Sequence, residues 1–198
     1  GGLTLGQACI TLNSIADREY LVYVVSLIRK LFGFDPIVLK RKGCNANSIL
    51  CDGVKLVEYL VGLGLEIGNK VKMQVGVPGW VVARKEYRLG CLRGLMDTDG
   101  GIFIHRYRVD RKEYKYLKLS FSNRSMPILG FVYDTLGEIG LGPKSRWERE
   151  NKQVWLYNQN EVKTYLQVVG THNPRLLKNR MLLEESDSLV HSGGLLNL

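Results

Sequence analysis

Residue types that build metal and disulfide sites are scarce in this chain of 198 residues. It has three histidines, and its four cysteines, Cys9, Cys44, Cys51 and Cys91, are never in C-x-x-C spacing. This pattern argues against a disulfide framework and against a zinc site of the usual spacing. We interpret the cysteines as reduced, mostly buried thiols in an intracellular protein.

Long apolar runs are missing as well. The longest, such as Tyr20–Ile28, are too short and too interrupted to cross a bilayer, and no secretory signal is visible at the N-terminus. We therefore expect no membrane partner, and we expect no small-molecule substrate.

Positive charge is what the chain has in excess. Lys and Arg number 28 against 19 Asp and Glu, which gives a formal net charge of +9, and both halves carry the excess. A chain that is basic along its whole length suggests a partner with extended negative charge, usually nucleic acid. From charge alone, a basic protein without such a partner is the alternative.

One pattern of residues occurs twice, at positions roughly 106 to 109 apart. Strand-like alternation in Ala8–Ser14 recurs in the same phase in Leu117–Asn123. Each strand is followed by an amphipathic helix that ends at glycine, a turn with proline, a hairpin and a further helix. These elements are Asp17–Phe32, Asp35-Pro36, Ile37–Cys51 and a helix from Val54 in the first copy, and Pro127–Ile139, Gly142-Pro143, Ser145–Tyr157 and a helix from Asn160 in the second.

The repeat predicts an α+β fold of two pseudo-symmetric halves with antiparallel sheets. In both copies the solvent side of the strands carries polar, hydrogen-bonding and basic residues. A solvated sheet face would look the same, but such a face also suits a β-ribbon that reads base edges in the major groove.

A helical segment with unusual glycines and acids stands between the copies. Its apolar stripe is formed by Leu89, Leu92, Leu95 and Met96. Gly90 and Gly94 lie four residues apart, and glycine within a helix usually marks a close backbone approach because it costs about 0.5–1 kcal/mol relative to alanine. The helix ends on Asp97 and Asp99, where the helix dipole disfavours acids unless a cation compensates.

The nonapeptide Leu92–Gly100 resembles the motif that names the LAGLIDADG homing endonucleases. Identical to that motif are Leu92, Gly94, Leu95, Asp97, Asp99 and Gly100. The Asn-Arg-Ser at 123–125 and the segment Gly68–Trp80 also resemble the family, so that the likeness runs over about residues 1 to 180.

The resemblance implies two αββαββα halves with saddle-like DNA-binding sheets and the motif helix at their junction. We expect an N-terminal half over 1–86, a C-terminal half over 87–180 and a tail over 181–198. It also implies Mg²⁺-dependent, site-specific cleavage of double-stranded DNA at a long pseudo-symmetric site by an intron- or intein-encoded enzyme. Asp99 is the expected catalytic metal ligand, the Thr98 carbonyl a second contact, and Ca²⁺ or Mn²⁺ substitutes for Mg²⁺; Asp97 is interpreted as structural.

The sequence departs from the family because it holds one such acidic helix, where two are expected to meet. Leu3–Leu5 and Ala8–Asn13 are predicted to form a hairpin; a second alignment takes residues 3–8 as a degenerate first motif, with Gln7 in place of the acid. We therefore expect a truncated or inactive form, or a second chain that supplies the helix against the glycine-bearing face of 88–98.

Residues expected to contact nucleic acid lie on strands and at hairpin tips. On the strands they are Thr11, Asn13, Lys118, Ser120 and Ser122; at the tips they are Lys40, Arg41, Lys42, Asn45, Asn47, His105, Arg106, Tyr107, Arg108, Arg111, Lys115, Arg146, Trp147, Arg149 and Lys152. The resemblance also implies lysines or glutamines that polarise a water molecule beside the metals, and the nearest candidates are Lys118, Lys152, Gln7 and Gln159.

Three other interpretations stay open. The chain could be a DNA-binding regulator without cleavage, which the single acid favours, or an RNA maturase on the same scaffold. It could also be a basic structural protein in which Asp99 is accidental, although the repeat and the motif together argue against this.

Overall fold

A computed structural model describes residues 2–148 and 152–182, and the contacts within the chain divide it into two compact units. Unit 1 comprises Gly1–Cys91 and Arg124–Phe131, and unit 2 comprises Leu92–Asn123 and Val132–Leu198. The boundary that the sequence predicts between residues 86 and 87 stays a prediction. Most of the expected tail, residues 183–198, lies outside the described residues.

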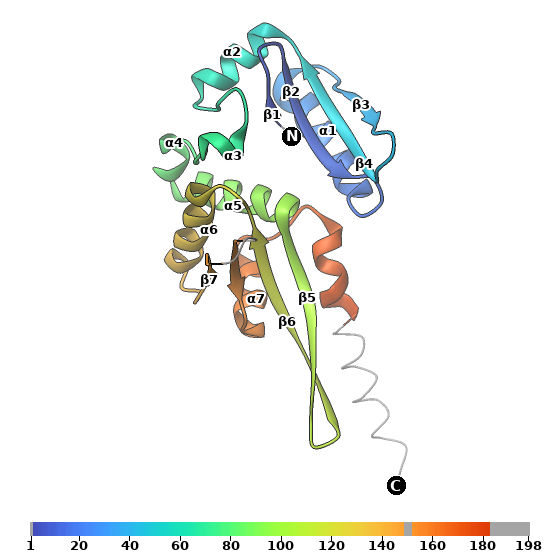
Figure 1. Ribbon diagram of the computed structural model, residues 1–198, viewed down its shortest axis with the longest axis vertical. Helices are drawn as coiled ribbons and strands as arrows, with labels where there is room; N and C mark the ends of the chain where they lie inside the picture. Colours follow the sequence, from blue (N-terminus) through green and yellow to red (C-terminus); the bar gives the residue numbers. More distant parts are fainter. Residues whose placement is uncertain (1, 149–151, 183–198) are drawn as a thin grey trace. The chain divides into compact units, whose positions relative to one another are not determined.

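Unit 1 contains a four-stranded antiparallel sheet, sheet A, with strand order β1-β2-β4-β3 (Figure 1). Its strands are β1 (Gly2–Leu3), β2 (Gln7–Asn13), β3 (Ile37–Lys40) and β4 (Ala46–Asp52). Its helices are α1 (Arg18–Phe32), α2 (Val54–Gly62), α3 (Lys70–Met73) and α4 (Gly79–Val82). Buried Tyr20, Val24 and Ile28 of α1 pack with Leu12 of β2 and with Ile49 and Cys51 of β4.

Unit 2 repeats this topology in sheet B, with strand order β5-β6-β8-β7. Its strands are β5 (Gly100–Val109), β6 (Lys112–Ser122), β7 (Lys144–Arg146) and β8 (Gln153–Leu156). Helix α5 (Lys85–Asp99) leads into β5, α6 (Met126–Glu138) follows β6, and α7 (Gln159–Val168) follows β8; residues 174–182 are also helical.

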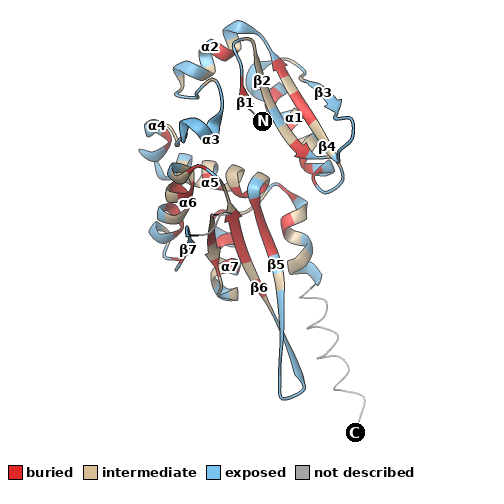
Figure 2. Cartoon of the chain, in the orientation of Figure 1, coloured by how far each residue is buried: buried red, intermediate tan, exposed pale blue. Residues whose placement is uncertain are grey.

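The core of unit 2 lies on one face of sheet B. Leu119 and Phe121 of β6 are fully buried, as is Leu156 of β8, and α7 contacts β6 and β8. Leu92 and Met96, two residues of the predicted apolar stripe of α5, are also fully buried. Figure 2 shows that β5 and β6 are buried toward the ends far from the hairpin that joins them and exposed toward the hairpin.

The architecture confirms the α+β prediction of two repeated halves with antiparallel sheets. Two short helices, α3 and α4, were not predicted; the Asn69 side chain starts α3 by accepting hydrogen bonds from the Val71 and Lys72 N–H groups. The expectation of mostly buried cysteines was wrong, because only Cys51 is buried and Cys44 is exposed in the β3–β4 turn. In the part of the chain that the structure describes, every helix is too short or too polar to cross a membrane.

Candidate nucleic-acid interface and helix end

Helix α5 ends at the residue that the sequence selects as a metal ligand. Asp99 is its last residue and is exposed, and Asn123, which follows β6, donates a hydrogen bond from Nδ2 to Asp99 Oδ2 at 3.4 Å. The carbonyl of Thr98 belongs to the last turn, where helix carbonyls have no partner within the helix. The end of α5 therefore presents a carboxylate and a backbone oxygen, which are the ligand types that Mg²⁺ prefers.

Asp97 has a structural surrounding, as expected. Its side chain is 1% exposed and accepts hydrogen bonds from the Thr171 hydroxyl and from the His172 N–H at 3.0 Å. Its carbonyl accepts from Asn173 Nδ2 at 2.8 Å and from Arg175 at 3.2 Å. Burial raises the pKa of Asp97 above its ordinary value, although these hydrogen bonds act in the opposite direction. The segment from Thr171 to Arg175 thus fixes the last turn of α5, and Asp99 with it.

Glycine is required where α5 passes into β5. A Cβ at Gly100 would come within 2.5 Å of the Met96 carbonyl oxygen, so only glycine lets the chain turn this tightly. By contrast, apart from the neighbouring residues and the helix's own backbone, no described atom lies within 4 Å of a Cβ built at Gly90 or Gly94. Steric crowding therefore does not require glycine at these two positions.

Sheet B has one face toward the core and one open face. The pairing of β5, β6 and β8 places Lys118, Ser120 and Ser122 on the open face together with His105 and Tyr107, as the alternation predicts. Lys118 and Ser122 are half-buried and Ser120 is buried on this face. The Lys118 ammonium group lies 5.1 Å from the Tyr116 ring and 5.0 Å from the Tyr157 ring, so it is held by cation–π contacts.

The β5–β6 hairpin extends beyond the rest of sheet B as a two-stranded ribbon (Figure 1). Its turn, Asp110-Arg111, has positive φ angles of 47° and 68° at non-glycine residues. Arg106, Arg108 and Lys115 lie on the ribbon face opposite His105 and Tyr107, and Glu113 forms ion pairs with Arg106 at 3.9 Å and Lys115 at 3.5 Å. The predicted tip residues are therefore exposed, but they are divided between two faces.

The other predicted contacts occupy different positions. Arg146 lies over the Trp155 and Tyr157 rings, and exposed Trp147 packs edge-on against Tyr133. Lys152 is half-buried beside β8, and Arg149 lies outside the described residues.

In unit 1, one cluster of predicted residues is brought together at the turn between β3 and β4. Lys40, Arg41, Lys42 and Asn45 line a shallow pocket there, and Arg41 donates a hydrogen bond to Ser48 Oγ at 2.9 Å. Asn47 is separate from Thr11, because the register places it on the face of Leu12.

Three of the predicted polar residues form hydrogen bonds within the fold. The Asn13 side-chain oxygen accepts hydrogen bonds from the Ile15 and Ala16 N–H groups, in the turn before α1. Gln7 donates to Asp52 at 2.6 Å, and the Gln159 side-chain oxygen accepts from the Leu117 N–H at 3.0 Å. These contacts give each residue a structural role.

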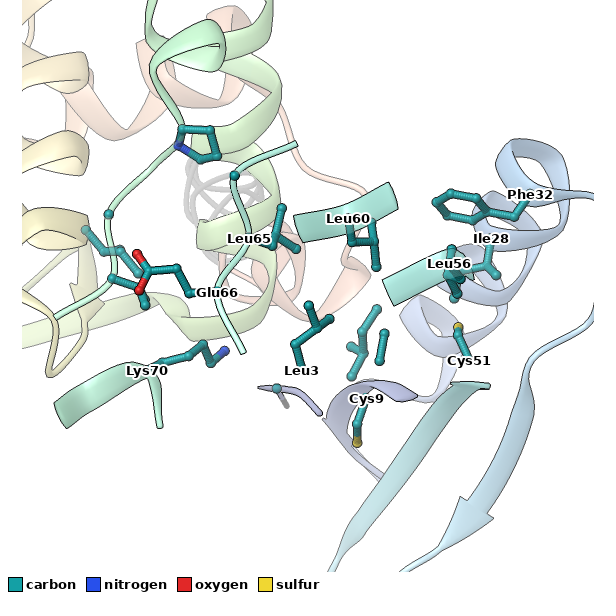
Figure 3. A pocket seen from close by; sticks show the side chains of 18 residues that line it. Leu3, Cys9, Ile28, Phe32, Cys51, Leu56, Leu60, Leu65, Glu66 and Lys70 are labelled. Atoms are coloured by element: carbon teal, nitrogen blue, oxygen red, sulfur yellow. The ribbon is translucent and has the colours of Figure 1, made fainter. Parts of the chain in front are cut away.

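An apolar pocket of about 400 Å³ lies in unit 1 (Figure 3). Leu3, Ile10, Leu56, Leu60 and Leu65 are among its lining residues. Ile10 pairs with Ile49 of β4 as Leu119 pairs with Leu156 of β8, so the two residues hold equivalent positions. Leu119 is fully buried, whereas Ile10 is 36% exposed. An apolar surface of sheet A is thus left partly exposed, whereas the equivalent surface of sheet B is buried within unit 2.

Sequence reasoning missed the rings of Phe103, Trp155 and Tyr157, which share the open face of sheet B. The alternation Gln153-Val154-Trp155-Leu156-Tyr157 could have placed Trp155 and Tyr157 opposite Val154 and Leu156.

The sequence matches no family model and no curated protein, but the fold matches solved structures. The meganuclease I-SmaMI bound to uncleavable DNA aligns with a TM-score of 0.61 at 9% identity, over 96% of this chain and 82% of that one. The LAGLIDADG homing endonuclease I-LtrWI bound to target DNA gives a TM-score of 0.60 at 10% identity, over 92% and 80%. I-DmoI in complex with DNA and Ca gives 0.56 at 12% identity, over 90% and 83%. The chain therefore has the fold of the LAGLIDADG homing endonucleases.

Proposed function

We propose that this chain is a site-specific endonuclease of the homing type, which hydrolyses phosphodiester bonds of double-stranded DNA with Mg²⁺. The observation that carries the proposal is the exposed carboxylate of Asp99 at the end of a helix that leads directly into sheet B. The structures similar to it include homing endonucleases bound to DNA, and those of I-DmoI were determined with Mn, Ca or Mg.

The chain's own residues supply one half of a metal site. Asp99 and the Thr98 carbonyl would hold the ion, and Asn123 orients the carboxylate through its hydrogen bond. In the described residues no cluster of three acidic, histidine or cysteine side chains surrounds them, so water and DNA phosphate oxygens would complete the shell. A bound Mg²⁺ supplies an activated water molecule and stabilises the departing oxygen.

The second half of the site would come from a second chain. We assign the apolar pocket of unit 1 to a helix from such a chain that resembles α5, because Leu92 and Met96 of α5 are fully buried in unit 2 while Ile10 stays partly exposed in unit 1. A helix of this kind that ends in a carboxylate would supply the second acid of the site.

A peptide with the sequence of α5, Lys85–Asp99, tests this assignment. The peptide should bind with a fluorescence anisotropy change, and Ile10→Glu should abolish binding because it places a charge in the pocket. Binding that Ile10→Glu leaves unchanged would contradict the assignment.

The DNA contacts would divide between the two units. The β3–β4 turn and the β5–β6 ribbon carry the charges suited to phosphates, and the open strand faces with Thr11 and Ser122 would meet base edges. Ser120 is 5% exposed and is too buried to do so. Such an interface covers about one helical turn per sheet, so the target would be a pseudo-symmetric site of roughly 20 base pairs. We also propose an intron or intein as the source of the gene and an intracellular site of action.

Selection from a pool of random duplexes in Ca²⁺ tests DNA recognition, and Mg²⁺ is then added to the selected site. Asp99→Asn should abolish cleavage and spare binding, because it removes the metal-binding charge and leaves the open face intact. Asp134→Asn, the same change at an exposed residue of α6, is the matched control and should cleave normally. Cleavage that survives Asp99→Asn would refute the assignment of the metal ligand.

Two other functions are outcomes of the same experiment. A selected duplex that is bound but never cut, even with the peptide present, would identify a DNA-binding regulator. Failure to enrich any duplex, together with binding of structured RNA, would identify an RNA maturase.

A further inference from the structure

The open face of sheet B is unusually rich in aromatic rings. The strand register and the ring contacts place on it Phe103, Tyr107, Tyr114, Tyr116, Trp155 and Tyr157. The chain has 18 aromatic residues in all, from 3 Trp, 10 Tyr and 5 Phe, so a third of them share this one face. His105 stands among them, 5.0 Å from the Tyr116 ring.

These rings are not needed to form the sheet. The equivalent face of sheet A has Ser48 where sheet B has Trp155, because Ser48 pairs with Thr11 as Trp155 pairs with Ser120. Three of the residues are exposed, since Phe103, Tyr107 and Tyr114 are 48%, 43% and 43% exposed, and Tyr116, Trp155 and Tyr157 are half-buried. A cluster of exposed rings on one face is typical of a binding surface.

Cations are interleaved with the rings. The Arg146 guanidinium lies 5.3 Å from the Trp155 ring and 5.5 Å from the Tyr157 ring, and Lys118 lies over Tyr157 from the other strand. The Trp155 and Tyr157 rings are themselves parallel, with centroids 5.5 Å apart. The face therefore combines flat apolar surfaces with fixed positive charges.

Paired and unpaired bases differ in what they can offer this face. In a duplex, bases present only their edges in the grooves, which polar side chains read. Unpaired bases present their flat faces, which stack on aromatic side chains, while nearby cations contact the backbone. Rings interleaved with Lys118 and Arg146 match the second chemistry.

We propose that the open face of sheet B binds a single nucleic-acid strand by stacking its unpaired bases on Phe103, Tyr107, Tyr114 and Trp155, with Lys118 and Arg146 toward the phosphates. This activity uses part of the surface assigned above to duplex DNA but requires neither Asp99 nor a metal ion. Single-stranded DNA and RNA share the stacking chemistry, and the 2′-hydroxyl group separates them.

The test measures anisotropy of labelled 20-nucleotide strands, one DNA and one RNA of the same sequence, and of the matching duplex, with EDTA present. Phe103→Leu and Tyr107→Leu should each weaken single-strand binding about tenfold, because each removes one stacking surface. Binding to the duplex should change much less. Leu39→Ala, at an exposed position of sheet A, is the control and should leave single-strand binding unchanged.

A second readout follows the ring directly. With Trp80 and Trp147 replaced by Phe, the remaining Trp155 fluorescence should be quenched by the single strand and much less by the duplex. Circular dichroism melting confirms that each variant is folded. Single-strand binding that the ring variants leave unchanged would overturn the proposal, as would equal losses for single strand and duplex.

The outcomes are distinguishable from those of the endonuclease proposal. Binding of a single strand that depends on the rings, without any selected duplex, would overturn the endonuclease proposal and support the single-strand proposal. A cleaved duplex site without ring-dependent binding of a single strand would do the reverse. Tighter binding of the RNA strand would identify RNA as the ligand of the open face of sheet B. Equal binding would show that this face accepts single strands of both DNA and RNA.

Discussion

Replacing Ile10 by alanine is expected to destabilise unit 1 much less than replacing Leu119 by alanine destabilises unit 2. The two residues hold equivalent positions in sheets A and B, but Ile10 is 36% exposed beside the apolar pocket and Leu119 is fully buried. Truncating a fully buried leucine costs about 2–5 kcal/mol, because transfer energy is lost and a cavity remains. For Ile10 part of the surface is already in water, so we expect about 1–2 kcal/mol.

The assay must report on each unit separately, because two units need not unfold together. Hydrogen exchange of amides in α1, which packs on sheet A, and in α7, which contacts sheet B, gives the two local free energies. Equal costs for the two substitutions would refute the reasoning, since they would mean that Ile10 is as well packed as Leu119. Adding the α5 peptide should raise the cost of Ile10→Ala toward that of Leu119→Ala.

Three further predictions concern single side chains. Arg111→Gly should stabilise the ribbon by about 1 kcal/mol, because glycine adopts a positive φ angle without strain, and should weaken DNA binding because a positive charge is lost. Hydrogen exchange measures the change in stability, and a salt titration of binding measures the lost charge. A destabilised ribbon would contradict the first expectation. At pH 8, iodoacetamide should alkylate exposed Cys44, and bound DNA should protect this cysteine. Burial raises the pKa of Cys91 to about 11, so Cys91 should react only as the pH approaches that value. Mass spectrometry of the peptides measures the alkylation of each cysteine, and rapid alkylation of Cys91 at pH 8 would contradict its burial. Tyr165→Phe should leave unit 2 as stable or up to about 2 kcal/mol more stable in chemical denaturation, because the buried Tyr165 hydroxyl has no hydrogen-bond partner among the described residues; a clear loss of stability would show that it has one.

The fold could be predicted from the sequence where the signal is local. Alternation in Ala8–Ser14 and Leu117–Asn123 gave the central strands, because one face of each sheet is buried and a period of two must then appear. The helix ending at Asp99 followed from its apolar stripe. Helices α3 and α4 escaped prediction because four residues are too few to show a helical period.

The site was harder to predict because it depends on pairing between distant segments. That Trp155 shares a face with Ser120 follows from the β6–β8 register, which the alternation of each strand leaves open. The β5–β6 register pairs Arg106 with Lys115, so both lie on the ribbon face opposite His105. The hydrogen bonds from Thr171 and His172 to Asp97 join residues more than 70 positions apart, and no local pattern signals them.

These contacts to Asp97 also set the order in which the site can form during synthesis. The end of α5 and all of sheet B emerge from the ribosome before the segment from Thr171 to Arg175, which fixes the last turn of the helix. Domains generally fold as units while the chain is being made, from the N-terminus onward. Because residues 171–175 belong to unit 2, Asp99 reaches its final position only after residue 175 has left the ribosome, together with the rest of that unit.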